Sequence, residues 1–330
     1  MNDTRQRMWR ALPFVMAMLL AAMIPLNAYA LFGRKAAEPE TAAGAPIARN
    51  MEIKAYRGVA YTGTLTATDN EGEAVTFHIA TLPAKGTLEF GEEGVFVYTP
   101  DANKAGSDSF TFTAVDESGN VSAPATVKIK IARVSSGVDY ADTEGRDCAT
   151  AAVDLAEHGV FVGSKVGGDW FFEPERTVTR GEFVTMALAA AGIEASDVTV
   201  TGFADDGAIP TWAKGSAAAA LAAGVVRGTA TENGVAFRAE RDVTLSEAAA
   251  MLGRILRVTD VDLTDFDETA PAWYAQAVAN LESVSVAPAG GFGGALDRSV
   301  TRGEAARLLS AAMALAEARG ENEGFWSRVF

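Results

Sequence analysis

The sequence has little cysteine, histidine or positive charge. Cys148 is the only cysteine among 330 residues, which excludes a disulfide framework and a thiolate metal cluster. The two histidines, His78 and His158, belong to no His-Glu-x-x-His motif, and neither a Gly-x-Ser-x-Gly motif nor a phosphate-binding loop is present. We therefore expect no enzymatic activity. Lys and Arg (28) are outnumbered by Asp and Glu (43), which argues against a nucleic-acid partner.

The sequence also lacks an apolar run long enough to span a bilayer. The run Ala11 to Ile24 contains Pro13 and falls short of the ~20 residues that a transmembrane helix needs. It lies between a basic start and the small-x-small segment Ala28-Tyr29-Ala30. This pattern predicts a secretory signal peptide at 1–30, cleaved after Ala30, with an uncleaved signal anchor as the alternative. We expect the mature chain, which has no transmembrane segment of its own, to be secreted and to reside at the cell surface.

Between about 31 and 134 the sequence changes from a tether to a β-rich segment. Residues 31–50 are rich in Ala, Glu, Pro, Thr and Gly and predict a flexible linker. Residues 51–134 alternate short apolar and polar runs with turn sequences, which is typical of a β-sandwich. The predicted strands are 63–68, 75–80, 86–90, 95–99, 109–115 and 125–132.

Three motifs carry a resemblance in this β-rich segment: Ala67-Thr68-Asp69-Asn70-Glu71-Gly72-Glu73, Pro83-Ala84-Lys85-Gly86-Thr87-Leu88, and Tyr98-Thr99-Pro100-Asp101 leading to Gly106-Ser107-Asp108-Ser109-Phe110. In these motifs the segment resembles bacterial immunoglobulin-like and cadherin-like domains. Some such domains bind Ca²⁺, and the oxygens available for it here belong to Asp69, Glu71, Glu73 and Asp116. Without an Asp-x-Asp-x-Asp-Gly loop we expect these acids to be turn residues, and we expect no cofactor. The sequence does not identify a ligand for this module.

The second half of the chain repeats one helix start three times. The sequences are Thr179-Arg180-Gly181-Glu182, Thr244-Leu245-Ser246-Glu247 and Thr301-Arg302-Gly303-Glu304. Thr-x-x-Glu is a capping box, in which the threonine hydroxyl and the glutamate carboxylate accept each other's backbone N–H. Apolar residues follow each box at the spacing of a helix buried on one face. These positions therefore predict a triplicated helical unit.

Each repeat shows the same landmarks before its box. An aromatic residue precedes Asp142, Asp205 and Asp267, and an alanine-rich helix is predicted next, at 150–157, 211–223 and 272–281. In the first two repeats this helix ends at a glycine turn that starts at Gly159 or Gly224, where glycine supplies a left-handed cap. A short loop with an aromatic residue leads to the box.

In this order of landmarks, the second half resembles the S-layer homology (SLH) domain. The repeats span 138–194, 201–258 and 264–317, followed by a C-terminal tail at 318–330. The resemblance implies a multidomain chain, in which a β-sandwich precedes an all-α pseudo-threefold bundle. It also implies anchoring to the bacterial cell wall through a secondary cell-wall polysaccharide, often pyruvylated and linked to peptidoglycan.

The resemblance places polysaccharide-binding positions in each repeat, and the chain departs from the pattern in all three. The implied positions are Asp142, Gly159 and Arg180, then Asp205, Trp212 and Gly224, then Asp267, Trp273 and Arg302. The arginine of the box is replaced by Leu245, a tryptophan is missing from the stretch 147–149, and Ser285 stands where glycine is expected. An arginine beside the unsatisfied N–H donors of a helix start is suited to a carboxylate ligand. We expect one or two sites, at Arg180 and Arg302, in grooves between neighbouring repeats.

Two other interpretations remain open. The chain could be a self-assembling S-layer or envelope-spacing protein, although it is short for a lattice subunit. The same repeats can also tie an outer membrane to peptidoglycan, but there a porin barrel usually accompanies them, and this chain has too few predicted strands for a barrel.

Overall fold

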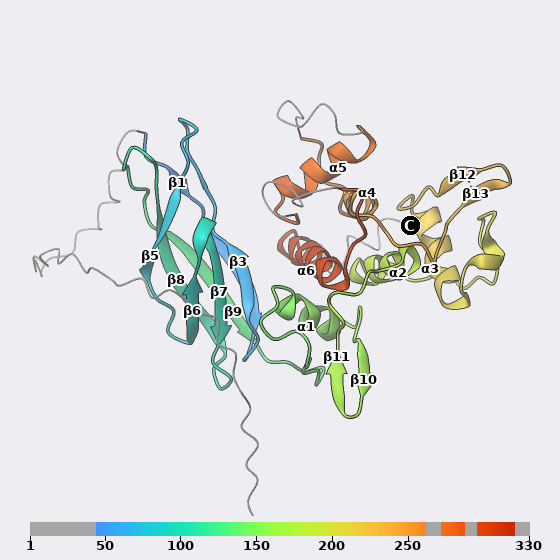
Figure 1. The fold of residues 1–330 in the computed structure, drawn as a ribbon, viewed down its shortest axis with the longest axis horizontal. Helices are drawn as coiled ribbons and strands as arrows, with labels where there is room; N and C mark the ends of the chain where they lie inside the picture. Colours follow the sequence, from blue (N-terminus) through green and yellow to red (C-terminus); the bar gives the residue numbers. More distant parts are fainter. Residues whose placement is uncertain (1–43, 262–271, 288–295, 321–330) are drawn as a thin grey trace, which may run out of the picture. The chain divides into compact units, whose positions relative to one another are not determined.

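The computed structural model describes residues 44–261, 272–287 and 296–320 (Figure 1). The predicted signal peptide, most of the predicted linker and the end of the predicted tail lie outside the described residues. Two parts can be followed along the described chain. A β domain is built from the first nine strands, and a helical region contains six α-helices and two small hairpins.

The β domain consists of two main sheets that share one core. A four-stranded sheet has the order β2-β9-β8-β5 and a three-stranded sheet has the order β3-β7-β6. A further short pair joins β1 to β4. The strands are β1 (Ile47–Ala48), β2 (Met51–Tyr56), β3 (Tyr61–Thr64), β4 (Ala67–Thr68), β5 (Thr76–Thr81), β6 (Gly86–Phe90), β7 (Val95–Pro100), β8 (Gly106–Val115) and β9 (Ala125–Ala132).

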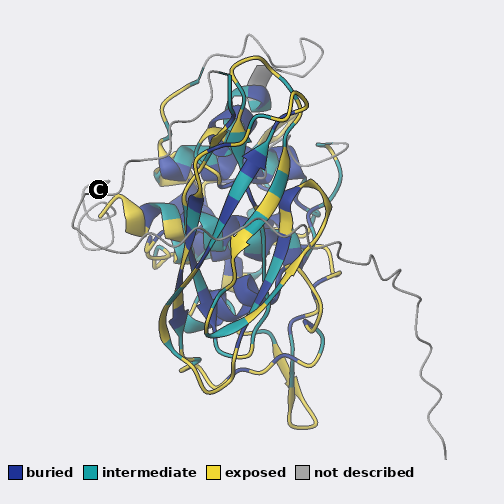
Figure 2. Ribbon diagram, turned by 90° about the vertical axis from the view of Figure 1, so that its left-hand side faces the viewer, coloured by how far each residue is buried: buried dark blue, intermediate teal, exposed yellow. Residues whose placement is uncertain are grey.

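The alternation read from the sequence sets which side chains enter this core. Phe96, Tyr98, Phe110, Phe112 and Val127 are completely buried between the sheets, and their neighbours along each strand are more exposed (Figure 2). Period-two patterning of this kind is what a sheet with one buried face requires. The predicted β-rich segment is therefore confirmed as a two-sheet arrangement consistent with a β-sandwich.

Two details of the β domain correct the sequence-based prediction. β1 lies within 31–50, the segment predicted to be a flexible linker, and pairs there with β4. β2 was not among the predicted strands; it pairs in parallel with β9, from Met51 opposite Val127 to Tyr56 opposite Ala132. A parallel neighbour that is far away in sequence leaves no hairpin signal, so local patterns could not identify this pairing.

The helical region contains the two helices predicted for each repeat. The first helices are α1 (Ala149–Glu157), α3 (Thr211–Ala222) and α5 (Ala272–Ser283), and the second helices are α2 (Arg180–Ala190), α4 (Leu245–Leu256) and α6 (Arg302–Ala318). The second helices α2, α4 and α6 contact one another in all three pairings. Each first helix packs on a second helix of another repeat, in the pairs α1 with α6, α3 with α2 and α5 with α4. We call these three contacts the α6–α1, α2–α3 and α4–α5 seams.

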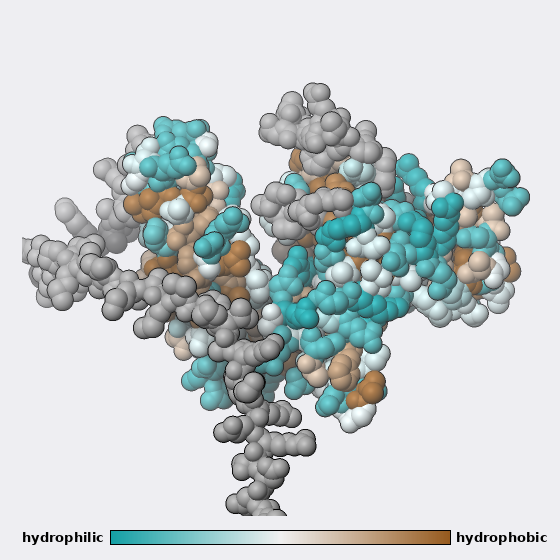
Figure 3. Space-filling model, in the orientation of Figure 1, coloured by the Kyte–Doolittle hydropathy of each residue, from teal (hydrophilic) through white to brown (hydrophobic). Residues whose placement is uncertain are grey.

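The loops before the first two boxes are β-hairpins, which corrects the prediction of a plain loop. β10 (Ser164–Val166) pairs with β11 (Asp169–Phe171), and β12 (Thr229–Thr231) pairs with β13 (Gly234–Ala236). The turn of the first hairpin is Gly167-Gly168, both with positive φ, as a two-residue hairpin turn favours. Val166 beside this turn is 63% exposed, and hydrophobic residues are visible on this hairpin in Figure 3, against a largely hydrophilic face of the helical region.

A closed ring of backbone hydrogen bonds joins the three repeats at their boxes. Val178 N–H donates to the Val300 carbonyl (2.9 Å), Val300 N–H donates to the Val243 carbonyl (3.0 Å), and Val243 N–H donates to the Val178 carbonyl (3.0 Å). All three valines are completely buried. The same residue of each repeat therefore makes the same contact in cyclic order, which gives the repeats a threefold relationship.

Candidate functional site

All three predicted capping boxes are present. In each, the threonine hydroxyl accepts from the glutamate N–H at 3.3 Å, and the glutamate carboxylate accepts from the threonine N–H at 2.9 to 3.2 Å. An arginine that was not among the predicted site residues lies three residues before each threonine. Arg176, Arg241 and Arg298 pair with the box glutamates at 2.7, 2.5 and 2.6 Å. The full repeated motif is Arg-x-Val-Thr-x-x-Glu, and its recurrence was visible in the sequence.

The helix starts are not open anion sites, and the prediction that they would offer free N–H donors was wrong. The first two helical N–H groups of each box donate to carbonyls of the next repeat at 2.8 to 3.1 Å. The pairs are Arg180 to Arg241, Gly181 to Ala239, Leu245 to Arg298, Ser246 to Leu296, Arg302 to Arg176 and Gly303 to Pro174. The third N–H is taken by the box threonine. These donors, which a helix leaves unpaired at its start, thus join the repeats to one another.

Arg180 lies between the first and second repeats, as predicted, but its side chain is only 9% exposed. Its guanidinium lies 5.5 Å from the centre of the Phe237 ring, and its Nη1 is 3.4 Å from Glu247 Oε1. Glu247 also accepts from Thr244 N–H and from Arg241, so its carboxylate is shared among several donors. Burial lowers the pKa of Arg180 below its ordinary value, partly offset by Glu247.

Arg302 lies between the third and first repeats in an equivalent position, with more direct hydrogen bonds. Its Nη1 donates to the Phe172 carbonyl at 2.6 Å and to Glu173 Oε2 at 3.2 Å, and its guanidinium lies 4.9 Å from the centre of the Phe161 ring. Burial lowers its pKa, with a further lowering from Arg176 and opposing effects of Glu173 and Glu182. In the second repeat, Leu245 takes this position and is completely buried.

The first two predicted aspartates hold the hairpins in place. Asp142 accepts from the N–H groups of Phe172 (2.8 Å) and Glu173 (2.6 Å). Asp205 accepts from the N–H groups of Phe237 and Arg238, both at 2.8 Å. Asp205 thus fixes Phe237, the aromatic residue beneath Arg180. Asp142 fixes Phe172, whose carbonyl accepts from Arg302 and whose ring contacts Phe161, the aromatic residue beneath Arg302. Asp267 lies outside the described residues.

The predicted glycine caps are confirmed by the backbone. Gly159 has φ +68° and Gly224 has φ +70°, directly after α1 and α3. Ser285 occupies the same place after α5 with φ +58°. A side chain is unfavourable in this conformation, which explains glycine at two of the three turns.

The position twelve residues before each turn residue is a tryptophan in two repeats and is called here the aromatic position of the seams. It is occupied by Asp147, Trp212 and Trp273. Trp212 is 54% exposed, and its Cη2 lies 3.5 Å from where a Cβ on Gly181 would be, directly beside Arg180. Asp147 instead forms an ion pair with Arg307 across the α6–α1 seam. The side chain of Trp273 lies outside the described residues. Of the predicted site residues, the structure brings Trp212 and the segment containing Arg180 together.

The acids considered for Ca²⁺ bond to neighbouring backbone and side chains. Asp69 Oδ1 accepts from the N–H groups of Glu71 and Glu73, Glu73 accepts from Ser118, and Asp116 accepts from Asn120. Among the described residues, no group of three or more His, Cys, Asp or Glu side chains is arranged to hold a metal ion. Within the same residues, no helix has the length and hydrophobicity to cross a bilayer. Burial raises the pKa of the Cys148 thiol to about 11.

Comparison with known families adds an assignment for the β domain. Residues 44–133 match the model of the bacterial cadherin-like domain. This stretch is a bacterial cadherin-like domain. The match extends the cadherin-like domain upstream of the predicted boundary at 51 and includes β1, in agreement with the pairing of β1 with β4.

Solved structures resemble the chain only over limited segments. An endo-fucoidan hydrolase from glycoside hydrolase family 107 is 24% identical with a TM-score of 0.24, over 28% of this chain and 14% of that one. The SrpA adhesin from Streptococcus sanguinis is 23% identical with a TM-score of 0.22, over 30% of this chain and 61% of that one. Fibronectin(III)-like modules of Clostridium thermocellum CbhA are 18% identical with a TM-score of 0.18, over 28% and 48%. This chain therefore spans less than two thirds of the first structures that it matches. A comparison with curated proteins found no match.

Proposed function

We propose that residues 138–317 are three SLH repeats, and that they anchor a secreted chain non-covalently to a peptidoglycan-linked wall polysaccharide. The observation that carries this proposal is the ring formed by Val178, Val243 and Val300. The ring relates three copies of one motif in cyclic order, as expected for a pseudo-threefold bundle, and it places three similar seams around the bundle.

The α2–α3 seam is the best candidate for the polysaccharide site. Trp212 offers an exposed aromatic face on which a sugar ring can stack. It lies beside Gly181, the residue that follows Arg180. Within the described part of the chain, the ion-pair partner of Arg180 is Glu247, which also accepts from Arg241 and Thr244. The Arg241 side chain is 37% exposed at the same box and adds a second positive charge. An anionic sugar, such as a pyruvylated one, fits this combination of aromatic surface and arginine.

The α6–α1 seam is less suited to an anionic polymer, although it contains Arg302. Arg302 is engaged by the Phe172 carbonyl and Glu173, and Asp147 occupies the aromatic position. The acidic side chains there would repel a carboxylate ligand. We therefore propose a single working site at Arg180 and Trp212, with Arg302 acting mainly as a structural contact between repeats.

The test is binding of the full chain to purified bacterial wall sacculi. The comparison uses native sacculi, sacculi stripped of their polysaccharide and a depyruvylated preparation. We expect Trp212→Ala to reduce affinity at least about tenfold, as for an exposed aromatic residue at the centre of a binding site. Leu221→Ala, at the other end of α3 and 36% exposed, is the matched control and should bind normally. Full binding by Trp212→Ala would reject this site, and equal binding to stripped sacculi would reject the anchoring function.

A further inference from the structure

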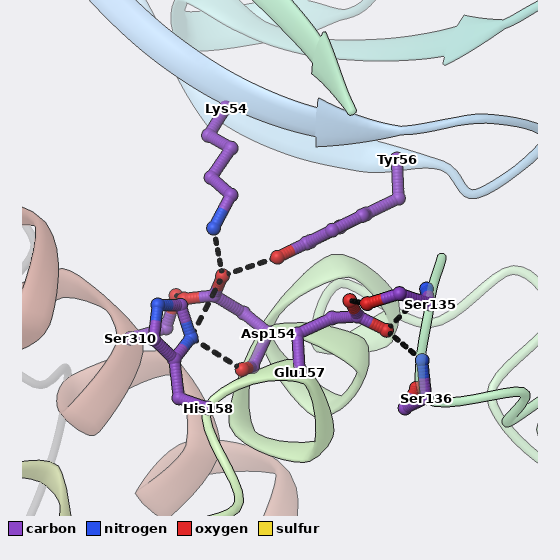
Figure 4. A network of polar contacts seen from close by, with 8 residues as sticks. All are labelled: Lys54, Tyr56, Ser135, Ser136, Asp154, Glu157, His158 and Ser310. Carbon is purple, nitrogen blue, oxygen red and sulfur yellow. Dashed lines mark hydrogen bonds and ion pairs between the residues drawn. The ribbon is translucent and has the colours of Figure 1, made fainter. Parts of the chain in front are cut away.

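A buried carboxylate joins the cadherin-like domain to two different repeats. Asp154 on α1 is 6% exposed. Its Oδ1 accepts from Tyr56 Oη at 2.6 Å and from Lys54 Nζ at 2.9 Å, both on β2. Its Oδ2 accepts from Ser310 Oγ on α6 at 2.8 Å, and His158 Nδ1 lies 3.6 Å from Oδ1 (Figure 4). The carboxylate thus connects β2, α1 and α6.

Apolar packing and further hydrogen bonds extend this contact. Tyr56 is 1% exposed and belongs to the hydrophobic core of the helical region, where Val59 and Val134 also pack. Thr150 Oγ1 donates to the Ala60 carbonyl at 2.8 Å. Ser135 and Ser136, which follow the cadherin-like domain, are held by Glu157, which accepts their N–H groups at 2.8 and 2.7 Å (Figure 4).

The polar pair at this contact is specific to one seam. Asp154 lies five residues before the turn residue of its repeat, where the second repeat has Ala219. Ser310 lies six residues after its box glutamate, where the first repeat has Leu188. The α2–α3 seam therefore has an apolar pair in the place of Asp154 and Ser310. In the α4–α5 seam the same positions are Asn280, which is buried but uncharged, and Gly253. Because a buried carboxylate is costly without several donors, its presence only where Lys54 and Tyr56 meet it points to a dedicated role.

We propose that the α6–α1 seam is a docking surface for the chain's own cadherin-like domain, and that Asp154 is the centre of a latch that holds this domain in one orientation. The domain is then presented rigidly on the helical region and does not swing on the Ser135-Ser136-Gly137 segment. The latch does not depend on the anchoring function proposed above, since its test requires no polysaccharide.

The first test is a distance measurement between the two parts of the full chain. Cysteines replace the exposed residues Glu92 and Glu232 in a Cys148→Ala background, and spin labels on them are measured by double electron–electron resonance. Alanine is a suitable replacement because Ala213 occupies the equivalent buried position of the second repeat. A single narrow distance distribution is expected, and it should broaden in Lys54→Ala/Tyr56→Phe. A broad distribution in the parent protein would overturn the proposal.

The second test is cleavage by trypsin after the exposed Arg133, just before the Ser135-Ser136-Gly137 segment. Lys54→Ala/Tyr56→Phe should be cleaved there about tenfold faster or more, because two donors to a buried carboxylate are lost. Ser310→Ala is the matched control: it removes a hydroxyl from the same carboxylate on the helical side alone, and its cleavage rate should match the parent. Tyr56→Phe alone keeps the aromatic ring in the core, so it is a variant that we expect to stay folded. Circular dichroism checks that each variant is folded. Equal cleavage of the parent and the latch variants would refute the latch.

Discussion

The side chain of Arg302 donates a 2.6 Å hydrogen bond to the backbone carbonyl of Phe172, joining the third repeat to the first. The contact is buried, and the Arg302 side chain is only 8% exposed. A carbonyl that is paired with a buried guanidinium cannot regain water when the guanidinium is removed. Arg302 therefore belongs to the structural interface between repeats, in addition to any role near a ligand.

We predict that Arg302→Ala lowers the free energy of unfolding by about 2–4 kcal/mol, through the unpaired carbonyl and the lost packing on Phe161. The measurement is urea denaturation of the full chain. Arg307→Ala is the control, because its ion pair with Asp147 joins two side chains that are 41% and 54% exposed. Solvent screening limits such a pair to less than about 1 kcal/mol. Equal losses in the two variants would contradict a structural role for Arg302.

The capping function can be isolated in the second repeat, whose box has Leu245 in place of the arginine that follows the threonine in the other two. Thr244→Ala removes the hydroxyl that accepts from Glu247 N–H and should cost about 1 kcal/mol of stability. Thr244→Ser keeps the hydroxyl and should restore most of this loss. Chemical denaturation compares the three proteins, and a serine variant as unstable as the alanine variant would show that the methyl group, and not the cap, matters.

The turn after α5 offers a stabilising substitution. Ser285 has φ +58°, a conformation that glycine adopts without steric cost. Ser285→Gly should raise the free energy of unfolding by about 1 kcal/mol. The reciprocal change, Gly224→Ser, introduces a side chain at the equivalent turn with φ +70° and should lower stability by a similar amount. If both variants shifted stability in the same direction, left-handed strain would not be the cause.

Local sequence signals predicted most of the elements, because the boxes, glycine turns and alternating strands depend on nearby residues. The six helices and the capping boxes follow from such patterns. The pairing of β2 with β9 and the ring of Val178, Val243 and Val300 join distant segments and leave no local trace.

The candidate site shows the same limit. The residue types were chosen from the repeat, but their burial was not predictable, because Arg180 and Arg302 are covered by aromatic residues from a neighbouring repeat. No role was predicted for Asp154 from the sequence, for a similar reason. A single aspartate in an alanine-rich helix looks like a solvated charge until Lys54, Tyr56 and Ser310 are placed around it.

Acid should weaken the contact of Glu157 with Ser135 and Ser136. Partial burial raises the pKa of this carboxyl, but hydrogen bonds from Ser135 and Ser136 outweigh this effect and hold the pKa at about 2, below its ordinary 4.5. A folded-state pKa below the unfolded value adds stability that is fully present above pH 4.5 and is lost as the pH falls toward 2. Carbon-13 NMR titration of the Glu157 carboxyl should therefore show a midpoint near pH 2.

The matching stability measurement uses Glu157→Gln. At pH 6 this variant should be less stable than the parent toward urea, because the amide cannot reproduce the charged acceptor for Ser135 and Ser136. The difference should shrink as the pH is lowered from 4.5 and nearly vanish near 2, where the parent carboxyl is itself protonated. Glu144→Gln, at an exposed turn, controls for the loss of one negative charge and should not show this convergence. A parent-to-variant difference that stays constant across this range would mean that the Ser135-Ser136 contact does not depend on the charge of Glu157.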